Sequence, residues 1–243
     1  MLKAGSQPTF ADDIRRGLAA IVSAVLIVMG AMLFTGFVVD LMRNASGGAA
    51  KLSNTGHWLA MVSFQAAMIA LAIVVAGLYG PARETLALRF GSGLLRRAAL
   101  PLIVSAGLMA LYSISAMALF PDAVTQDLSV FLRLLADVPP WLPPIVLVVG
   151  APLSEELVFR GYLLGQLRQT RIGFVGAAVI STFGWTLLHL SYTIVGLIDV
   201  FLAGLLFSWS LWRTGTLWVP IGFHALYNAI VLVVISTTMA QPA

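Results

Sequence analysis

Residues 17–39 read GLAAIVSAVLIVMGAMLFTGFVV, a run of 23 residues without a single charged side chain. A helix rises about 1.5 Å per residue, so a run of this length can cross the hydrocarbon core of a bilayer, which is about 30 Å thick. The run is longer than the apolar region of a secretory signal peptide, and no small-residue cleavage site follows it. We therefore expect a retained membrane-spanning helix over residues 17–40.

Apolar runs of comparable length recur along the rest of the chain, at residues 57–80, 98–120, 141–165, 173–190, 194–212 and 215–236. A helix satisfies its own backbone hydrogen bonds inside lipid, so each run is expected to be helical. The sequence therefore predicts an all-α, polytopic transmembrane bundle of about seven to eight helices, forming a single integral-membrane domain over residues 1–243. The eighth candidate, 122–138, mixes apolar and charged side chains and is expected to be an amphipathic, interfacial helix.

The composition agrees with a membrane protein and excludes several other classes. Hydrophobic residues make up 60% of the chain, charged residues make up 10%, and the mean hydropathy is +0.97. Soluble domains carry about 25% charged residues. The net charge is +4, but the basic residues are scattered between apolar runs, so no nucleic-acid partner is expected. The absence of cysteine excludes a thiol nucleophile, a disulfide framework and a cysteine-ligated metal.

The distribution of basic residues predicts an orientation in the membrane. If the spans alternate, one side of the membrane receives most of the arginines: Arg15, Arg16, Arg83, Arg89, Arg96, Arg97, Arg168, Arg171 and Arg213. The other side holds Arg43, Lys51 and an acidic loop with Asp122, Asp127 and Asp137. Because cytoplasmic loops carry the excess of Lys and Arg, we expect a cytoplasmic N-terminus.

Ionisable side chains inside the apolar runs are confined to the second half of the chain. The later runs contain Glu155, Glu156, Arg160, His189, Asp199 and His224, whereas the interiors of the first three runs contain none. A charge at the centre of a bilayer costs at least about 2.5–3.5 kcal/mol, so these placements indicate function. We expect a catalytic core at about 140–235, preceded by N-terminal spans at about 17–120. Asp199 is interpreted as a packing or capping residue and is left outside the site.

The spacing of the polar residues permits them to converge. Glu156 and Arg160 lie four residues apart and can pair on one helix face, which leaves Glu155 as the freer carboxylate and the candidate general base. Glu155 and His189 both lie roughly 20–24 Å from the turn between their helices, so they can face each other. With a modest tilt His224 reaches the same level, and Asn228 follows one turn later on the same face.

Three motifs here resemble those of the CPBP family, which includes CAAX prenyl endopeptidases and bacterial Abi proteins. The first is Glu155-Glu156-x-x-x-Arg160, and the third is His224-x-x-x-Asn228. The second is an aromatic residue four positions before His189. The similarity covers about residues 150–230, with order and spacing intact. One departure is Trp185, which stands where the family usually has phenylalanine in the second motif.

The resemblance implies an intramembrane endopeptidase of a bacterial cell membrane that acts on membrane-associated peptides or proteins. Roles of this kind include CAAX-like processing, maturation of peptides or bacteriocins, and self-immunity. Carried over by motif, Glu155 and His189 would activate a water molecule, while His224 and Asn228 would stabilise the oxyanion. Glu156 and Arg160 would orient the site and could meet a substrate carboxylate.

Two other classes of function remain compatible with these residues. A transporter would also place acids and histidines inside the membrane, and a non-catalytic scaffold could retain the same fold. The sequence lacks evident inverted repeats and a His-Glu-x-x-His or Gly-x-Ser-x-Gly motif, which favours the glutamate–histidine endopeptidase. The expected partners are the lipid bilayer and the substrate, and the sequence does not determine an oligomeric state.

The role of a metal is also left open by the sequence. Members of the family have been labelled metalloproteases, and Glu155, His189 and His224 could form a zinc site with two histidines and one carboxylate. We favour hydrolysis without a metal or other cofactor, because the third motif supplies a pair of hydrogen-bond donors for the oxyanion.

Overall fold

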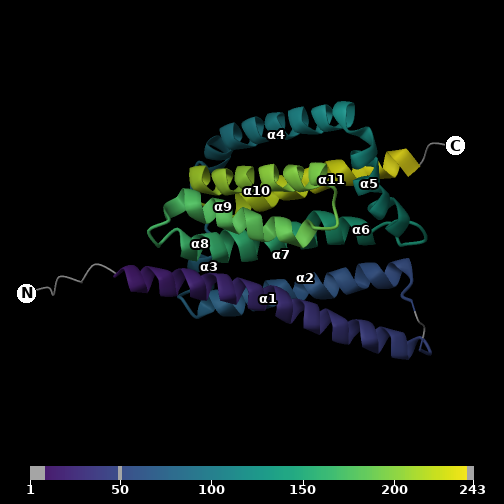
Figure 1. Cartoon of the computed structure of the whole chain (residues 1–243), viewed down its shortest axis with the longest axis horizontal. Helices are drawn as coiled ribbons and strands as arrows, with labels where there is room; N and C mark the ends of the chain where they lie inside the picture. Colours follow the sequence, from purple (N-terminus) through teal and green to yellow (C-terminus); the bar gives the residue numbers. More distant parts are fainter. Residues whose placement is uncertain (1–8, 49–50, 240–243) are drawn as a thin grey trace, which may run out of the picture.

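The computed structural model describes residues 9–48 and 51–239, and the described chain is helical and contains no strand. Its first half forms α1 (Phe10–Ala45), α2 (Asn54–Gly77), α3 (Ala82–Thr85), α4 (Leu94–Leu119) and α5 (Pro121–Leu134). The long helices run along a common direction and are joined by turns at the two ends of the bundle (Figure 1). The predicted all-α helical bundle is confirmed.

The second half begins with one long helix of mixed geometry and continues with three further helices. The long helix comprises α6 (Leu142–Pro144), η1 (Ile145–Gly150), α7 (Ala151–Glu156), η2 (Leu157–Leu163) and α8 (Leu164–Leu167). It is followed by α9 (Gly173–Thr186) with η3 (Leu187–His189), then α10 (Ile194–Thr214) and α11 (Trp218–Met239). In Figure 1 these elements lie between the α1–α2 pair on one side and α4 on the other.

Among the described residues, six helices are long and apolar enough to cross a membrane. They are Phe10–Ala45, Asn54–Gly77, Leu94–Leu119, Leu142–Leu167, Ile194–Thr214 and Trp218–Thr237. The expected span at 173–190 is the shorter apolar helix Gly173–His189, which ends in a 3₁₀ turn. At about 1.5 Å per residue it measures roughly 26 Å, somewhat less than the hydrocarbon core. The expected amphipathic segment at 122–138 is present as α5, packed against α4, α10 and α11.

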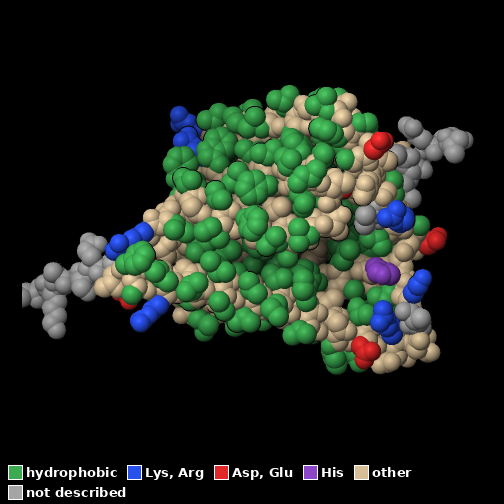
Figure 2. Space-filling model, in the orientation of Figure 1, with side chains coloured by type: hydrophobic (Ala, Val, Ile, Leu, Met, Phe, Trp, Pro, Cys, Tyr) green, Lys and Arg blue, Asp and Glu red, His purple; other side chains and the backbone are tan. Residues whose placement is uncertain are grey.

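The surface separates into an apolar middle and two charged ends. In the view of Figure 2, hydrophobic side chains cover the middle of the molecule, while Lys, Arg, Asp and Glu gather at its two ends. Large apolar side chains such as Leu33, Leu95 and Ile103 are at least 71% exposed. Water would disfavour so much exposed apolar surface, whereas lipid solvates it, as expected for an integral membrane protein.

Helix α1 shows how little of each outer helix is buried within the protein. Its buried residues are Ala20, Ala24, Ile27 and Ala31, which repeat at three- and four-residue intervals and form one stripe. This stripe of mainly small side chains lets α1 approach α2 closely, and the rest of the helix faces outward. By contrast, every residue of η2 is buried, so the segment that follows the two glutamates lies at the centre of the protein.

Candidate functional site

The motif glutamates lie on α7, which is flanked by two π-helical segments of the same helix. In the first of these, η1, the N–H of Ala151 bonds to the carbonyl of Val146, five residues earlier. Proline at 152 lacks an N–H, so the carbonyl of Leu147 receives no backbone donor in this register. Segments of π-helix are frequent at functional sites because they change which residues face the interior.

Asn228 donates the hydrogen bond that Pro152 cannot donate. Its Nδ2 donates to the Leu147 carbonyl oxygen at 2.8 Å, which ties α11 to the helix that carries the glutamates. Gln65 of α2 donates in the same way to the carbonyl of Val146, at 3.0 Å. One N–H of the Asn228 side-chain amide therefore makes a structural hydrogen bond. Its second N–H and its side-chain oxygen are left to bind a ligand.

Glu156 and Arg160 form a fully buried ion pair. Nη1 of Arg160 lies 3.0 Å from Oε1 of Glu156, and both side chains have no exposed surface. The aromatic rings of Trp185 and Phe207 lie 4.3 Å and 5.4 Å from the guanidinium carbon. The predicted pairing is thus present, and aromatic faces separate the guanidinium from open space.

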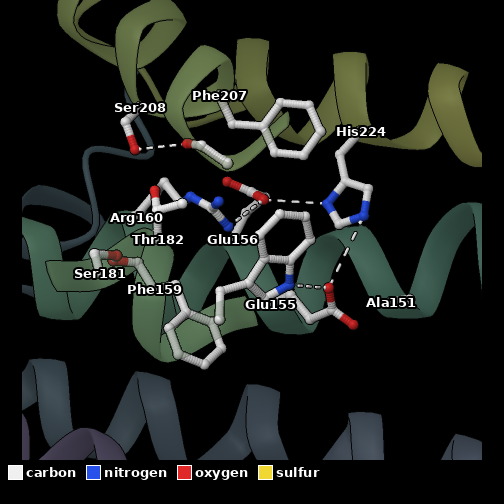
Figure 3. Close-up of polar contacts among 12 residues, drawn as sticks. Ala151, Glu155, Glu156, Phe159, Arg160, Ser181, Thr182, Phe207, Ser208 and His224 are labelled. Atoms are coloured by element: carbon white, nitrogen blue, oxygen red, sulfur yellow. Dashed lines mark hydrogen bonds and ion pairs between the residues drawn. The ribbon is translucent and has the colours of Figure 1, made fainter. Parts of the chain in front are cut away.

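Helix α10 passes close to this ion pair because Gly204 has no side chain. A Cβ at position 204 would lie 2.5 Å from Nη2 of Arg160 and 2.6 Å from Cγ2 of Thr182. Ser208, one turn later on α10, donates to the carbonyl of Gly204 (Figure 3). Glycine is therefore required where α10 crosses the arginine.

His224 bridges the two glutamates. Its Nδ1 lies 3.1 Å from Oε1 of Glu156, and its Nε2 lies 3.9 Å from Oε2 of Glu155 (Figure 3). A carboxylate can only accept, so Nδ1 carries the hydrogen, and Nε2 is the atom presented towards Glu155. The histidine is 4% exposed, and its ring is stacked on Phe207 with centroids 4.8 Å apart.

Glu155 has a partner that the sequence did not reveal. The indole Nε1 of Trp185 donates to Oε2 of Glu155 at 2.5 Å. In the sequence, Trp185 stands where similar proteins usually have phenylalanine. Tryptophan, unlike phenylalanine, carries an N–H, and this is the one signal in the sequence that could have suggested the contact.

His189, the last residue of η3, also contacts Trp185. Its Nδ1 is 3.2 Å from the carbonyl oxygen of Trp185, and its ring centroid is 5.2 Å from the Trp185 ring. A carbonyl accepts only, so Nδ1 donates, and a neutral His189 keeps a lone pair on Nε2. His189 and Glu155 line one cavity, but these two described side chains make no hydrogen bond to each other.

A cavity of about 500 Å³ opens beside these residues. Four predicted site residues line it: Glu155, His189, His224 and Asn228. Glu156 and Arg160 do not line it, because they lie behind Trp185 and Phe207. The structure therefore brings the six predicted residues into one region and divides them into four at the cavity and two behind it.

Further polar residues at the cavity were not assigned to the site from the sequence. Asp199, which the sequence analysis treated as a packing or capping residue, lines the cavity and accepts a short hydrogen bond of 2.5 Å from the Tyr227 hydroxyl. Asp127 of α5 lines it too and accepts from both the N–H and the hydroxyl of Thr193, at 2.7 and 2.8 Å. These contacts hold α5 and α11 against α10.

Tyr192 adds a neutral hydroxyl to the cavity, in the turn before α10. Burial raises the pKa of its phenol well above the usual range, and the neighbouring acids Glu155, Asp127 and Asp199 raise it further. The hydroxyl therefore stays protonated and remains a hydrogen-bond donor. Nothing in the sequence around residue 192 distinguished this tyrosine from an interfacial one.

The arrangement does not fit a zinc site made from Glu155, His189 and His224. Among the described residues, no three His, Cys, Asp or Glu side chains lie close enough together to hold a metal ion. Trp185 contacts both imidazoles, at 5.2 and 5.4 Å between ring centroids, and its N–H occupies Oε2 of Glu155. We therefore derive no chemical step through a metal.

Comparison with known proteins gives one match. Residues 137–230 match the family model described as "Type II CAAX prenyl endopeptidase Rce1-like". No curated protein and no solved structure matches the chain. The matched segment begins just before α6 and ends within α11, so it contains all six predicted site residues together with Trp185 and Asp199.

The match confirms the resemblance that the three motifs suggested, and it supports peptidase activity. It covers the helices that carry the six predicted site residues and leaves α1 to α5 outside, although α2, α4 and α5 also contribute to the cavity wall. Over residues 137–230 the chain is similar to the Rce1-like type II CAAX prenyl endopeptidases.

Proposed function

We propose that the chain is an intramembrane endopeptidase in which Glu155 activates a water molecule to hydrolyse a peptide bond of a membrane-associated substrate. One observation carries the proposal. Glu155 lies at the wall of a cavity of about 500 Å³, with one carboxylate oxygen held by Trp185 and with His189 and His224 lining the same space. A positioned carboxylate beside two imidazoles is suited to general acid–base catalysis.

In the proposed reaction, Glu155 acts first as a base and then as an acid. Its Oε2 is held by the indole of Trp185, so Oε1 accepts a proton from water. The oxygen of that water bonds to the carbonyl carbon of the substrate. The proton then passes from Glu155 to the leaving nitrogen as the carbon–nitrogen bond breaks, giving a carboxylic acid and an amine.

His189 assists from the opposite side of the water in this proposal. Its Nδ1 hydrogen is directed to the Trp185 carbonyl, which leaves the Nε2 lone pair to accept a hydrogen bond from the attacking water. This orients the water without requiring the histidine to touch Glu155.

Stabilisation of the oxyanion is assigned to His224 and Asn228. Glu156 accepts from Nδ1 of His224 and so orients the ring, and when Nε2 carries a hydrogen it can donate to the oxyanion. The second N–H of the Asn228 amide is available as a further donor, since only one bonds to Leu147. Donors aimed at a developing oxyanion contribute about 2.7–4 kcal/mol each. Glu156 and Arg160 then act through His224, as positioning residues.

The proposed chemistry uses no metal. This is tested by incubating the purified protein with a chelator, measuring peptide cleavage, and determining bound metals by mass spectrometry. We expect unchanged cleavage and no stoichiometric zinc. Zinc at one equivalent, with activity lost on its removal and restored on its return, would reverse this part of the proposal.

The proposal itself is tested with the full chain in detergent or liposomes and a library of quenched fluorescent peptides. Glu155→Gln removes the base and keeps the shape of the side chain, so cleavage should fall by about 10²–10⁴-fold. Glu84→Gln is the matched control, because Glu84 is exposed and pairs with Arg89 far from the cavity. Wild-type levels of cleavage by the Glu155→Gln protein would contradict the assignment.

A transporter remains the alternative that this experiment separates. Three acids and two histidines line one cavity, which suits a reaction site better than a pathway. A solute flux in liposomes that survives both Glu155→Gln and His189→Ala, without any peptide cleavage, would favour transport.

A further inference from the structure

A second cavity, of about 210 Å³, lies at the end of the bundle that carries the N-terminus of α1. It forms where α8 meets α1 and the short helix α3, three elements that lie together at this end (Figure 1). Its wall is polar and includes Arg16, Glu84, Thr85, Gln166, Arg168 and Gln169. None of the six residues predicted for the peptidase site lines this second cavity.

Gln166 places a buried amide without a partner at the second cavity. The residue is 5% exposed, and its side chain makes no hydrogen bond to another described residue. The amide of Gln169, by contrast, is satisfied at both ends. Its Nε2 donates to the carbonyl of Gly165 at 2.9 Å, and its Oε1 accepts from Nη1 of Arg16 at 3.3 Å. An unpaired buried amide is unfavourable, so Gln166 indicates a ligand that reaches into the second cavity.

Two arginines in the wall of the second cavity are not paired with a carboxylate. Arg16 bonds to the neutral Gln169, and the guanidinium of Arg168 makes no hydrogen bond or ion pair to another described residue. Glu84 supplies the carboxyl group among the described lining residues, and it pairs with Arg89 outside the cavity. The second cavity therefore presents two guanidinium groups and a free amide, which is a set of donors suited to an anion.

The second cavity lies where the apolar middle of the molecule meets its charged end. Leu18 follows Arg16 by two residues, Leu78 precedes the lining residue Tyr79, and both leucines are exposed to the surroundings of the protein. Charged side chains gather beyond them at the end of the molecule (Figure 2). A ligand with acyl chains would lie along the apolar surface and place its headgroup at the level of the second cavity.

We propose that the second cavity binds the phosphate group of an anionic phospholipid. The planar guanidinium groups of Arg16 and Arg168 match the geometry of phosphate oxygens, and Nε2 of Gln166 donates to a further oxygen. Basic pockets between membrane helices recognise lipid headgroups in this way. The bound headgroup joins α1 and α3 to α8, which continues the helix that carries Glu155. The proposal does not depend on the peptidase reaction.

The test measures lipid binding to the full-length protein in detergent by native mass spectrometry. The protein is titrated with phosphatidylglycerol and, separately, with phosphatidylcholine that has the same acyl chains. We expect phosphatidylglycerol to bind at least about tenfold more tightly, because the choline group cancels the charge that the two arginines would otherwise neutralise. Equal affinity for the two lipids would overturn the proposal.

Two substitutions assign the binding to the second cavity. Gln166→Leu keeps the size of the side chain and removes its donor, and Arg168→Gln removes one charge at an exposed position. Each should weaken phosphatidylglycerol binding by about fivefold or more. Arg96→Gln is the matched control, because Arg96 is an exposed arginine that does not line the second cavity, and it should leave the affinity unchanged. Wild-type affinity in both the Gln166→Leu and Arg168→Gln proteins would also overturn the proposal.

Inorganic phosphate and glycerol 3-phosphate distinguish a lipid headgroup from a soluble phosphate. Both carry the charge that the arginines recognise, but neither has acyl chains to lie on the surface beside Leu18 and Leu78. We therefore expect them to displace phosphatidylglycerol only weakly. Displacement by inorganic phosphate at concentrations similar to those of the lipid would show that the second cavity binds a soluble anion, and would overturn its assignment to a phospholipid.

Discussion

At the scale of single residues, the tryptophan at position 185 sets the geometry of the candidate site. Its ring makes contacts with His189 and His224, its face covers Arg160, and its indole N–H bonds to Glu155. One side chain thus separates the buried ion pair from the cavity and holds the proposed base at the cavity wall. Phenylalanine could make the ring contacts but not the hydrogen bond.

The substitution Trp185→Phe isolates that hydrogen bond. The aromatic wall is kept, and Oε2 of Glu155 loses its donor. A hydrogen bond to a charged group contributes about 1.5–3 kcal/mol, so kcat should fall by about tenfold or more if the bond is needed to position the base. KM should change little, because the indole N–H is directed to Glu155 rather than to the cavity.

The control for this substitution is Trp212→Phe on α10. Trp212 is 58% exposed and lies near Arg213, away from the cavity. Peptide cleavage by both variants, with circular dichroism to verify the fold, makes the comparison. A Trp185→Phe protein with unchanged kcat would show that the hydrogen bond has no part in positioning Glu155.

At the scale of elements, the helix from Leu142 to Leu167 departs from regular α-helix on both sides of the glutamates. Its π-helical segments flank α7, and Pro152 leaves the Leu147 carbonyl for Asn228 of α11. The third motif is therefore linked to the first by a structural hydrogen bond as well as by proposed chemistry. Asn228→Ala should destabilise the protein by about 1–3 kcal/mol, the cost of a buried acceptor left without a donor.

A double substitution tests this origin of the effect. Pro152→Ala restores an N–H at the position that Leu147 would use in a π-helical register, so the alanine at 228 should be less destabilising in that background. The four proteins of the cycle are compared by thermal unfolding in detergent. Additive losses would mean that Asn228 and Pro152 act independently.

At the scale of the whole molecule, the apolar middle and the charged ends set how the protein lies in a bilayer. Of the six long apolar helices, all but α1 contribute residues to the cavity wall, as does the shorter Gly173–His189 helix. The charged side chains gather at the two ends of the molecule (Figure 2). The end with the α1 N-terminus carries the arginine-rich loops, and the opposite end carries the turn after α1. A cytoplasmic arginine-rich end remains a prediction of the positive-inside rule.

The orientation can be measured directly because the chain contains no cysteine. Ser92 lies in an exposed turn between α3 and α4, at the arginine-rich end, and Ser46 lies in an exposed position after α1 at the other end. A membrane-impermeant thiol reagent applied to intact cells should label Ser46→Cys and spare Ser92→Cys. Labelling of both becomes equal once the membrane is permeabilised, and the reversed pattern on intact cells would contradict the prediction.

The sequence by itself determined the fold class and the residues that belong together. Long uncharged runs must be helices in lipid, because no other segment satisfies its backbone there, and rare intramembrane charges mark the site. These two arguments, with the motif spacing, predicted the Glu156–Arg160 pair and the convergence of Glu155, His189, His224 and Asn228. The span expected at 173–190 is present as the apolar helix Gly173–His189, whose last three residues form a 3₁₀ turn.

Only the tertiary structure decided what each of those residues touches. The bridging of both glutamates by His224, the tryptophan bond to Glu155 and the inclusion of Asp199 in the cavity all join helices distant in the sequence. Helical spacing fixes which face a residue shares with its neighbours along one helix. It carries no information about rotation and depth between helices, and these depend on packing such as that of α10 at Gly204.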